Sequence, residues 1–318
     1  MTTYPNSAAR RSPAGGLPGA LPEPPPGPTP GPLPGPLPGP LVDAGWLADR
    51  LGAPGLVLFD ASVGAHRGAA RRIPGARPFD LDGALSDHDA PAPHTMPGAE
   101  AFTEALRALG VDDTSTVVVY DGAGIYSSAR AWWMLRAMGF DRAAVLDGGL
   151  PAWIASGGAV EPAAAAYGGP PGTFTARPRP GLVVDAAAVA AALADPAAAV
   201  LDARTRGRFT GADPEPRPGL RGGHMPGALN LPFAELQRPD GRMRPAEELR
   251  AALHALAGDR EHLYFSCGSG VTACVLALAA TLAGRDGLAV YDGSWSEWGL
   301  PSELRPVVTD RQEPPSGG

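Results

Sequence analysis

Residues 262–274 read HLYFSCGSGVTAC, and this stretch decides the fold class. An apolar run, Leu263–Phe265, leads to Cys267, a Gly-Ser-Gly turn follows, and the Ala/Leu-rich segment Val271–Ala283 has a helical composition. Short apolar strands that alternate with helices predict a parallel sheet covered on both faces, with ligands bound beyond the carboxyl ends of the strands. The stretch therefore predicts an α/β fold and places Cys267 at the edge of the sheet where a site is expected.

The same pattern occurs twice in the chain. Four motifs of the first half recur in the same order in the second half, which indicates an internal duplication. The pairs are VLFDAS (57–62) with VLDART (200–205), RIPGARPFDL (72–81) with HMPGALNLPF (224–233), TVVVYDGAGI (116–125) with HLYFSCGSGV (262–271), and VLDGGLPAW (145–153) with VYDGSWSEW (290–298). We expect two domains, 41–158 and 182–304, and a linker at 159–181. The Pro/Gly-rich residues 1–40 are predicted to be a disordered tail, and 305–318 a second loose tail.

Composition excludes several classes of partner. The 318-residue chain has a net charge of -7, and all of its 26 basic residues are arginine. An acidic chain argues against nucleic acid or an anionic membrane as the main partner. No apolar run of about 18 residues predicts a membrane span, and the N-terminus lacks the apolar stretch of a secretory signal. Two cysteines without a Cys- or His-rich cluster predict neither a disulfide framework nor a metal site, and we expect a cytoplasmic protein.

Cys267 could be a metal ligand, half of a disulfide, a small buried residue or a nucleophile, and the cysteine count disfavours the first two roles. Gly268 and Gly270 allow a tight turn with positive φ, so that successive N–H groups point inward at the start of a helix and cradle an anion. A thiolate in that cradle can attack a sulfur atom, and the cradle then suits the resulting persulfide anion. The local sequence favours the nucleophile but leaves the buried residue open.

Two positions that follow the loop, Ala273 and Cys274, bear on which chemistry the site can perform and which cysteine can perform it. Cysteine phosphatases need an arginine six residues after the cysteine to bind phosphate, and Ala273 stands there. Phosphate chemistry is therefore disfavoured. Cys274 belongs to a stripe with the spacing of a buried helix face, and it is predicted to pack in the core. The stripe consists of Val271, Cys274, Val275, Leu278 and Leu282.

The motifs CGSGVTA, RIPGA, HMPGA, LDGGLPAW and YDGSWSEW together resemble the rhodanese superfamily, and within it the tandem-domain 3-mercaptopyruvate and thiosulfate sulfurtransferases. The resemblance spans about residues 41–304. It implies two tandem rhodanese-like domains, each a five-stranded parallel sheet flanked by helices, with the active site between them. Asp121 stands in the first domain where Cys267 stands in the second. Because a carboxylate is no sulfur nucleophile, the first domain is expected to be catalytically silent.

The resemblance also implies the donor and its contacts. Thiosulfate sulfurtransferases carry basic residues after the cysteine, whereas the neutral Gly268 and Ser269 match the mercaptopyruvate branch. Arg208 and Arg217 match two arginines that grip the carboxylate and keto oxygen in that branch, and a planar guanidinium suits an α-keto acid. Gly268, Gly270, Val271 and Thr272 are expected to complete the binding loop. Three other arginines of the stretch are expected to be solvated: Arg204, Arg206 and Arg221.

A proton relay is a further implication of the resemblance. Ser269 lies in the loop itself, PAPHTMPGAE matches a family segment that supplies His94, and FDLD matches one that supplies Asp82. Such a relay moves a proton to the pyruvate enolate as the C–S bond breaks. The stretch Ala65–Arg72 is shorter here than in the family.

The sequence therefore predicts a sulfurtransferase that moves sulfur from 3-mercaptopyruvate, through a persulfide on Cys267, to a thiol or to cyanide. The expected acceptor is a thioredoxin-like protein or a low-molecular-weight thiol, and no cofactor is expected. Two alternatives stay open: thiosulfate as the donor, and a non-catalytic persulfide carrier.

Overall fold

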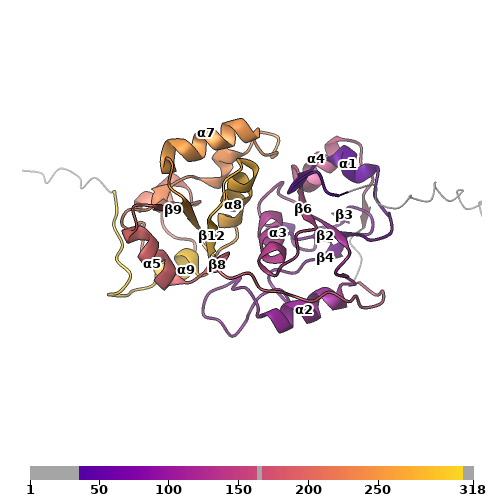
Figure 1. Cartoon of the computed structure of the whole chain (residues 1–318), viewed down its shortest axis with the longest axis horizontal. Helices are drawn as coiled ribbons and strands as arrows, with labels where there is room; N and C mark the ends of the chain where they lie inside the picture. The colour runs from indigo at the N-terminus through magenta and orange to yellow at the C-terminus, as the bar shows by residue number, and fades with distance from the viewer. Residues whose placement is uncertain (1–35, 163–166, 311–318) are drawn as a thin grey trace, which may run out of the picture.

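The computed structural model describes residues 36–162 and 167–310. Figure 1 shows two α/β domains side by side, with the earlier part of the chain in one and the later part in the other. The predicted disordered tail lies outside the described residues except for 36–40.

The first domain is built on a parallel sheet with the strand order β1-β6-β5-β2-β4. Its central strands are apolar and buried because helices cover both faces, as the sequence pattern predicts. The strands are β1 (Leu41–Val42), β2 (Leu56–Asp60), β4 (Arg77–Pro78), β5 (Thr116–Tyr120) and β6 (Ala143–Leu146). The helices are α1 (Ala44–Ala48), α2 (Ala99–Ala108), α3 (Ser128–Ala137) and α4 (Gly149–Ala155), with a 3₁₀ turn, η1, at Gly64–His66.

The second domain repeats this architecture, with the order β8-β12-β11-β9-β10. Its strands are β8 (Val183–Val184), β9 (Ala198–Asp202), β10 (Leu229–Asn230), β11 (His262–Ser266) and β12 (Leu288–Tyr291). Its helices are α5 (Ala186–Ala194), α6 (Arg206–Thr210), α7 (Ala246–Ala257), α8 (Ala273–Leu282) and α9 (Ser294–Trp298), with a 3₁₀ turn, η2, at Phe233–Leu236. The predicted fold class, two tandem parallel sheets flanked by helices, is confirmed.

Helices α3 and α8 form the contact between the domains (Figure 1). One apolar cluster runs through both, from Trp132 and Trp133 on α3 to the alanines of α8. Residues Ala273–Ala280 are therefore buried on every side of α8, a wider burial than the predicted stripe. Since α8 begins directly after the Cys267 loop, this interface sets the loop against the first domain.

Two segments predicted as connectors are attached to the domains. Within the predicted linker, β7 (Glu161–Pro162) pairs antiparallel with β3 (Arg71–Arg72), and Phe174 is buried with its N–H donating to the Val111 carbonyl. The first six residues of the predicted loose tail, 305–310, are bound to the second domain, because Val308 and His224 exchange backbone hydrogen bonds. The expectation of a loose segment is wrong there, while 311–318 lie outside the described residues. The domain limits themselves stay predictions.

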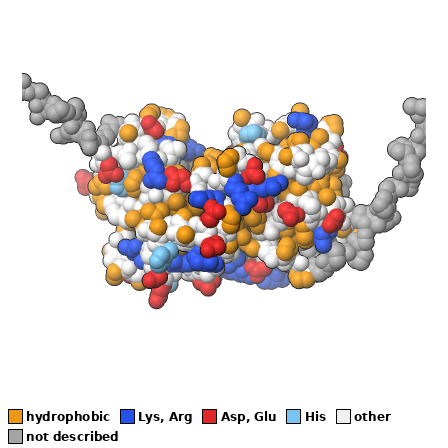
Figure 2. All heavy atoms as spheres, turned by 90° about the horizontal axis from the view of Figure 1, so that it is seen from above, with side chains coloured by type: hydrophobic (Ala, Val, Ile, Leu, Met, Phe, Trp, Pro, Cys, Tyr) orange, Lys and Arg blue, Asp and Glu red, His pale blue; other side chains and the backbone are white. Residues whose placement is uncertain are grey.

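Charges on one face of the molecule are mixed rather than segregated (Figure 2). On the face shown in Figure 2, basic and acidic side chains lie side by side across the middle, and the surface is hollowed between two lobes. That face offers no extended basic surface of the kind that binds nucleic acid. Among the described helices, none has the length and apolar character needed to cross a membrane.

Candidate active site

The loop after β11 is held in place by α9, which donates hydrogen bonds to two of the loop's carbonyl groups. Trp295 N–H donates to the Cys267 carbonyl at 2.9 Å, and Ser296 donates to the Gly268 carbonyl through N–H at 2.8 Å and Oγ at 2.6 Å. The N–H groups of residues 268–272 find no acceptor in the described part of the chain. Gly270 turns the loop at φ +75, and a Cβ there would lie 2.8 Å from the Asp292 carbonyl. The loop conformation requires glycine at 270, and N–H groups without an internal acceptor are available to bind an anion.

The two cysteines differ in their surroundings. Cys267 is 2% exposed and lines a cavity of about 320 Å³ between the domains, whereas Cys274 is fully buried in α8. The Cys274 thiol donates to the Gly270 carbonyl at 3.2 Å, and burial raises its pKa to about 12. Both thiols are free. Only Cys267 therefore faces space that a substrate can enter, and Cys274 packs in the core as predicted.

Arg208 and Arg217 both approach the cysteine loop. A Cβ built on Gly268 would lie 3.2 Å from Arg208 Nη2 and 3.8 Å from Arg217 Nη1, so both guanidinium groups stand directly over this residue. Glu215 anchors Arg208 through contacts of 2.6 and 3.2 Å. Arg217 has no ion pair or hydrogen bond within the described residues, so its guanidinium is available to an anion.

The first domain contributes a chain of hydrogen bonds to the same cavity. His94 Nδ1 lies 3.0 Å from Ser269 Oγ, and its Nε2 lies 2.8 Å from Asp82 Oδ1. In a neutral imidazole that donates its Nε2–H to the carboxylate, Nδ1 accepts the Ser269 hydroxyl. The structure thus brings Ser269 of the second domain together with His94 and Asp82 of the first domain, although Asp82 reaches the cavity only through His94.

His94 is held in place by contacts that the sequence does not reveal. Its backbone is in the left-handed region at φ +61, which is uncommon for a residue other than glycine. The buried Arg130 donates to the His94 carbonyl at 2.8 Å and to Asp292 Oδ1 at 2.6 Å. Asp292 also accepts the Met96 N–H at 2.8 Å. These bonds fix the His94 segment of the first domain on the second domain.

Arg204 is a correction to the sequence analysis. It was expected to be solvated, but its side chain is fully buried, lies 3.9 Å over the Trp295 ring and is paired with Asp202 at 2.6 Å and Glu215 at 2.8 Å. Glu215 therefore bridges Arg204 to Arg208. Arg206 is exposed and paired with Glu235, whereas Arg221 donates to the carbonyls of the carboxyl-terminal segment.

Three residues that line the cavity were missed: Tyr126 and Val63 from the first domain, and Pro216. Burial and the neighbouring Cys267 both raise the pKa of Tyr126, so its hydroxyl is a donor at neutral pH. The signal for Tyr126 was present, because it directly follows the first-domain repeat of the cysteine loop, residues 116–125. Gly270, by contrast, shapes the loop without lining the cavity.

The first-domain copy of the loop shows what such a cradle holds. The Asp121 carboxylate is 1% exposed and accepts hydrogen bonds at 2.8–3.0 Å from the N–H groups of Ala123, Tyr126, Ser127 and Ser128. The Ser128 hydroxyl adds a fifth bond at 2.7 Å. This loop therefore surrounds its own anion, at the position that Cys267 has in the second domain.

Comparisons with known proteins agree with this architecture. A family model of the rhodanese-like domain matches residues 43–156 and 185–300. The 3-mercaptopyruvate sulfurtransferase of Escherichia coli (strain K12) is 40% identical over 274 residues, covering 83% of this chain and 96% of that protein. Thiosulfate/3-mercaptopyruvate sulfurtransferase 1, mitochondrial, of Arabidopsis thaliana is 39% identical over 297 residues, covering 83% and 77%. SseA from Escherichia coli, solved as a 3-mercaptopyruvate sulfotransferase, matches with a TM-score of 0.70 and 37% identity over 81% of this chain and 100% of that one. The resemblance inferred from the motifs is confirmed.

Proposed function

The chain belongs to the rhodanese family and is a sulfurtransferase, and we propose that it takes sulfur from 3-mercaptopyruvate with Cys267 as the nucleophile. The observation that carries this choice of donor is the pair of guanidinium groups of Arg208 and Arg217 over Gly268, beside the cysteine. The first domain, with Asp121 at the corresponding position, is catalytically silent and supplies one wall of the cavity.

In the first half-reaction, the Cys267 thiolate attacks the sulfur of HS–CH₂–CO–COO⁻, so that an S–S bond forms and the S–C bond breaks. The electron pair of the S–C bond leaves on the methylene carbon as the pyruvate enolate. The thiol proton of the donor ends on that carbon, and the products are pyruvate and the anion Cys267–S–S⁻. The N–H groups of residues 268–272 face no other acceptor in the described chain and stabilise this anion.

The two arginines favour a keto acid over thiosulfate. A forked guanidinium binds a carboxylate through two parallel hydrogen bonds, and the second guanidinium is placed for the keto oxygen. As that carbonyl becomes an enolate, negative charge grows on its oxygen, and a nearby guanidinium stabilises it more than in the ground state. The neutral Gly268 and Ser269 add no further positive charge for a dianionic donor.

Ser269, His94 and Asp82 form the proton relay of the proposal. The Ser269 hydroxyl is the member in the loop, His94 Nδ1 lies 3.0 Å from it, and Asp82 holds the imidazole through Nε2 at 2.8 Å. Ser269 and His94 can deliver a proton to the enolate carbon and recover one from the donor thiol, because the hydroxyl and the imidazole each accept and donate in turn, whereas the Asp82 carboxylate only accepts the Nε2–H and orients the ring. Val271 and Thr272 line the remaining wall of the loop.

In the second half-reaction, a thiolate or cyanide removes the outer sulfur and regenerates the Cys267 thiolate. The acceptor is a thioredoxin-like protein or a low-molecular-weight thiol, and the cavity between the domains is its route to the persulfide. A reducing, cytoplasmic setting is part of the proposal, since both thiols are free and the acceptor must stay reduced.

Mass spectrometry of the protein after addition of 3-mercaptopyruvate tests the nucleophile. We expect one added sulfur atom on the Cys267 peptide, lost in Cys267→Ser and retained in the matched control Cys274→Ala. An adduct on Cys274 alone, or none, would refute the mechanism.

Steady-state kinetics with the two donors test the substrate. A higher kcat/KM for thiosulfate than for 3-mercaptopyruvate would overturn the choice of donor but not the persulfide. A stable persulfide without turnover would instead indicate a carrier.

A further inference from the structure

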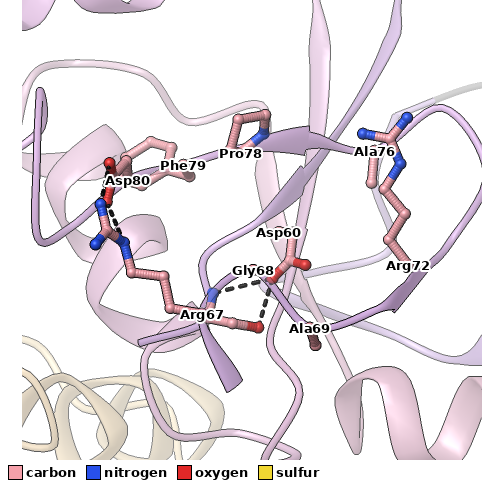
Figure 3. Close-up of a pocket in the computed structure, with 10 residues that line it drawn as sticks. Asp60, Arg67, Gly68, Ala69, Arg72, Ala76, Pro78, Phe79 and Asp80 are labelled. Atoms are coloured by element: carbon pink, nitrogen blue, oxygen red, sulfur yellow. Dashed lines mark hydrogen bonds and ion pairs between the residues drawn. The ribbon is translucent and has the colours of Figure 1, made fainter. Parts of the chain in front are cut away.

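A second cavity lies in the first domain, away from the cysteine loop. It has a volume of about 200 Å³ and opens at the carboxyl end of β2, where Asp60 is the last strand residue. Figure 3 shows Asp60 at its centre, with Arg67 and Arg72 on opposite sides. Ala76 and Phe79 supply apolar walls.

The duplication shows what fills the same place in the second domain. Asp60 ends β2 and corresponds to Asp202 at the end of β9, in the matched motifs VLFDAS and VLDART. Two residues later the second domain has Arg204, whose guanidinium binds Asp202 through Nε at 2.9 Å and Nη2 at 2.6 Å. The first domain has Ser62 at that position. The carboxylate is thus kept, but its guanidinium is replaced by a hydroxyl.

The chain that covers this place is also shorter in the first domain. Between the strand and the Pro-Gly-Ala motif, the second domain inserts α6 and the segment with Glu215, which closes over Arg204 at 2.8 Å. In the first domain, only the 3₁₀ turn η1 and the short strand β3 occupy this stretch. The first domain has no counterpart of Arg204 or of Glu215 in this described stretch. The space that the Arg204 guanidinium fills in the second domain is therefore left open beside Asp60.

The charges around the cavity leave Asp60 without a cation. Arg67 forms a two-pronged pair with Asp80 at 3.0 and 2.7 Å, and Arg72 is paired with Glu161 at 2.7 Å. Among the described residues, Asp60 accepts hydrogen bonds only from neutral groups: the N–H and hydroxyl of Ser62 at 3.0 and 2.5 Å, and the Tyr120 hydroxyl at 3.4 Å. Burial raises the pKa of this carboxyl, as expected for an anion that lacks a positive partner.

We propose that this cavity binds a small guanidinium compound, whose planar head takes the place beside Asp60 that the Arg204 guanidinium takes beside Asp202. A guanidinium is favoured over an ammonium because its planar fork can contact both oxygens of a carboxylate. In the second domain, Arg204 Nε contacts Asp202 Oδ1 at 3.1 Å and Oδ2 at 2.9 Å, and Nη2 contacts Oδ2 at 2.6 Å. The bound cation also restores the charge balance of a half-buried carboxylate. The proposal does not depend on the proposed sulfur transfer, although Arg67 in the wall of this cavity lies 3.8 Å from Asp82 of the proposed relay.

Isothermal titration of the full chain with methylguanidinium chloride, at constant ionic strength, tests the proposal. We expect one saturable site with a Kd of about 10 mM or tighter. Methylammonium chloride, with the same charge but no fork, should bind at least about tenfold more weakly. No saturable binding, or equal affinity for the two cations, would overturn the proposal.

Two variants locate the site. Ser62→Arg supplies the missing guanidinium from the chain itself, and Asp60→Asn removes the charge, so each should weaken methylguanidinium binding at least about tenfold. Asp240→Asn, at an exposed carboxylate of the second domain, is the matched control and should leave the Kd unchanged. The Ser62 hydroxyl also accepts the Gly122 N–H, so circular dichroism must show that Ser62→Arg is folded. Unchanged affinity in folded Ser62→Arg or in Asp60→Asn would place any binding elsewhere and refute the site.

Discussion

Replacing Arg217 by methionine should lower kcat/KM for 3-mercaptopyruvate by about ten- to 150-fold. This factor corresponds to the loss of one charge-assisted hydrogen bond to the donor, about 1.5–3 kcal/mol. Among the described residues, the substitution breaks no ion pair that would change this value. Arg217 has no ion pair within the described residues, so its whole interaction is available to the donor. Methionine keeps much of the length and apolar stem of arginine, which limits the change to the guanidinium.

The assay is the steady-state formation of pyruvate with saturating thiol acceptor. If Arg217 binds the carboxylate equally in the ground and transition states, the KM rises and kcat changes little; if it binds the keto oxygen, kcat falls as well. Arg217→Lys should recover part of the loss, because it restores the charge but not the fork. Arg206→Met is the control, since Arg206 on α6 is exposed and paired with Glu235 of η2, and its kcat/KM should stay within about twofold of the unchanged protein. An unchanged kcat/KM in Arg217→Met would refute the role of this arginine.

Three further predictions concern the relay, the second cysteine and the first-domain loop. Asp82→Asn should lower kcat about 100-fold with little change in KM, because His94 Nε2 loses its anionic acceptor. The rate of pyruvate formation measures this effect, and an unchanged kcat would show that the relay is not used. At pH 8, iodoacetamide should alkylate Cys267 in the native protein and spare Cys274, whose pKa of about 12 keeps it a thiol; native labelling of Cys274 would contradict its burial. Asp121→Ala should lower the free energy of unfolding, measured by urea denaturation, by at least about 3 kcal/mol, because buried N–H groups lose their acceptor. A decrease below about 1 kcal/mol would argue that these hydrogen bonds do not stabilise the first-domain loop.

The elements nearest to the repeated motifs were the most predictable. Leu263–Phe265 forms the middle of β11, the glycine turn follows it, and α8 begins at Ala273, because strand, turn and helix each depend on residues that are close in the chain. The correspondence between residues 116–125 and the cysteine loop at 262–271 could be recognised from the order and spacing of the repeated motifs alone. The clustering of His94 with Ser269 was inferred from a family resemblance, and nothing in the local sequence of His94 indicates its φ of +61.

The burial of Arg204 could not be predicted from its local sequence. A stretch with five arginines in an acidic chain indicates solvated charge, yet Arg204 is enclosed because Asp202, Glu215 and Trp295 meet around it. The same holds for Arg130, which is hydrogen-bonded to Asp292 across the domain interface. A charge can be buried when its partners neutralise it, and those partners come from distant parts of the chain.

The sequence by itself determined the duplication and the α/β class, since these follow from periodicity and from residue types at fixed spacing, and the family resemblance predicted which cysteine acts. Only the tertiary structure decided which charges face the cavity, which are neutralised inside, and that Asp60 in the first domain stands beside an open space. The physical reason is that burial and electrostatic pairing depend on contacts between segments that are distant in the chain, and no local pattern records them.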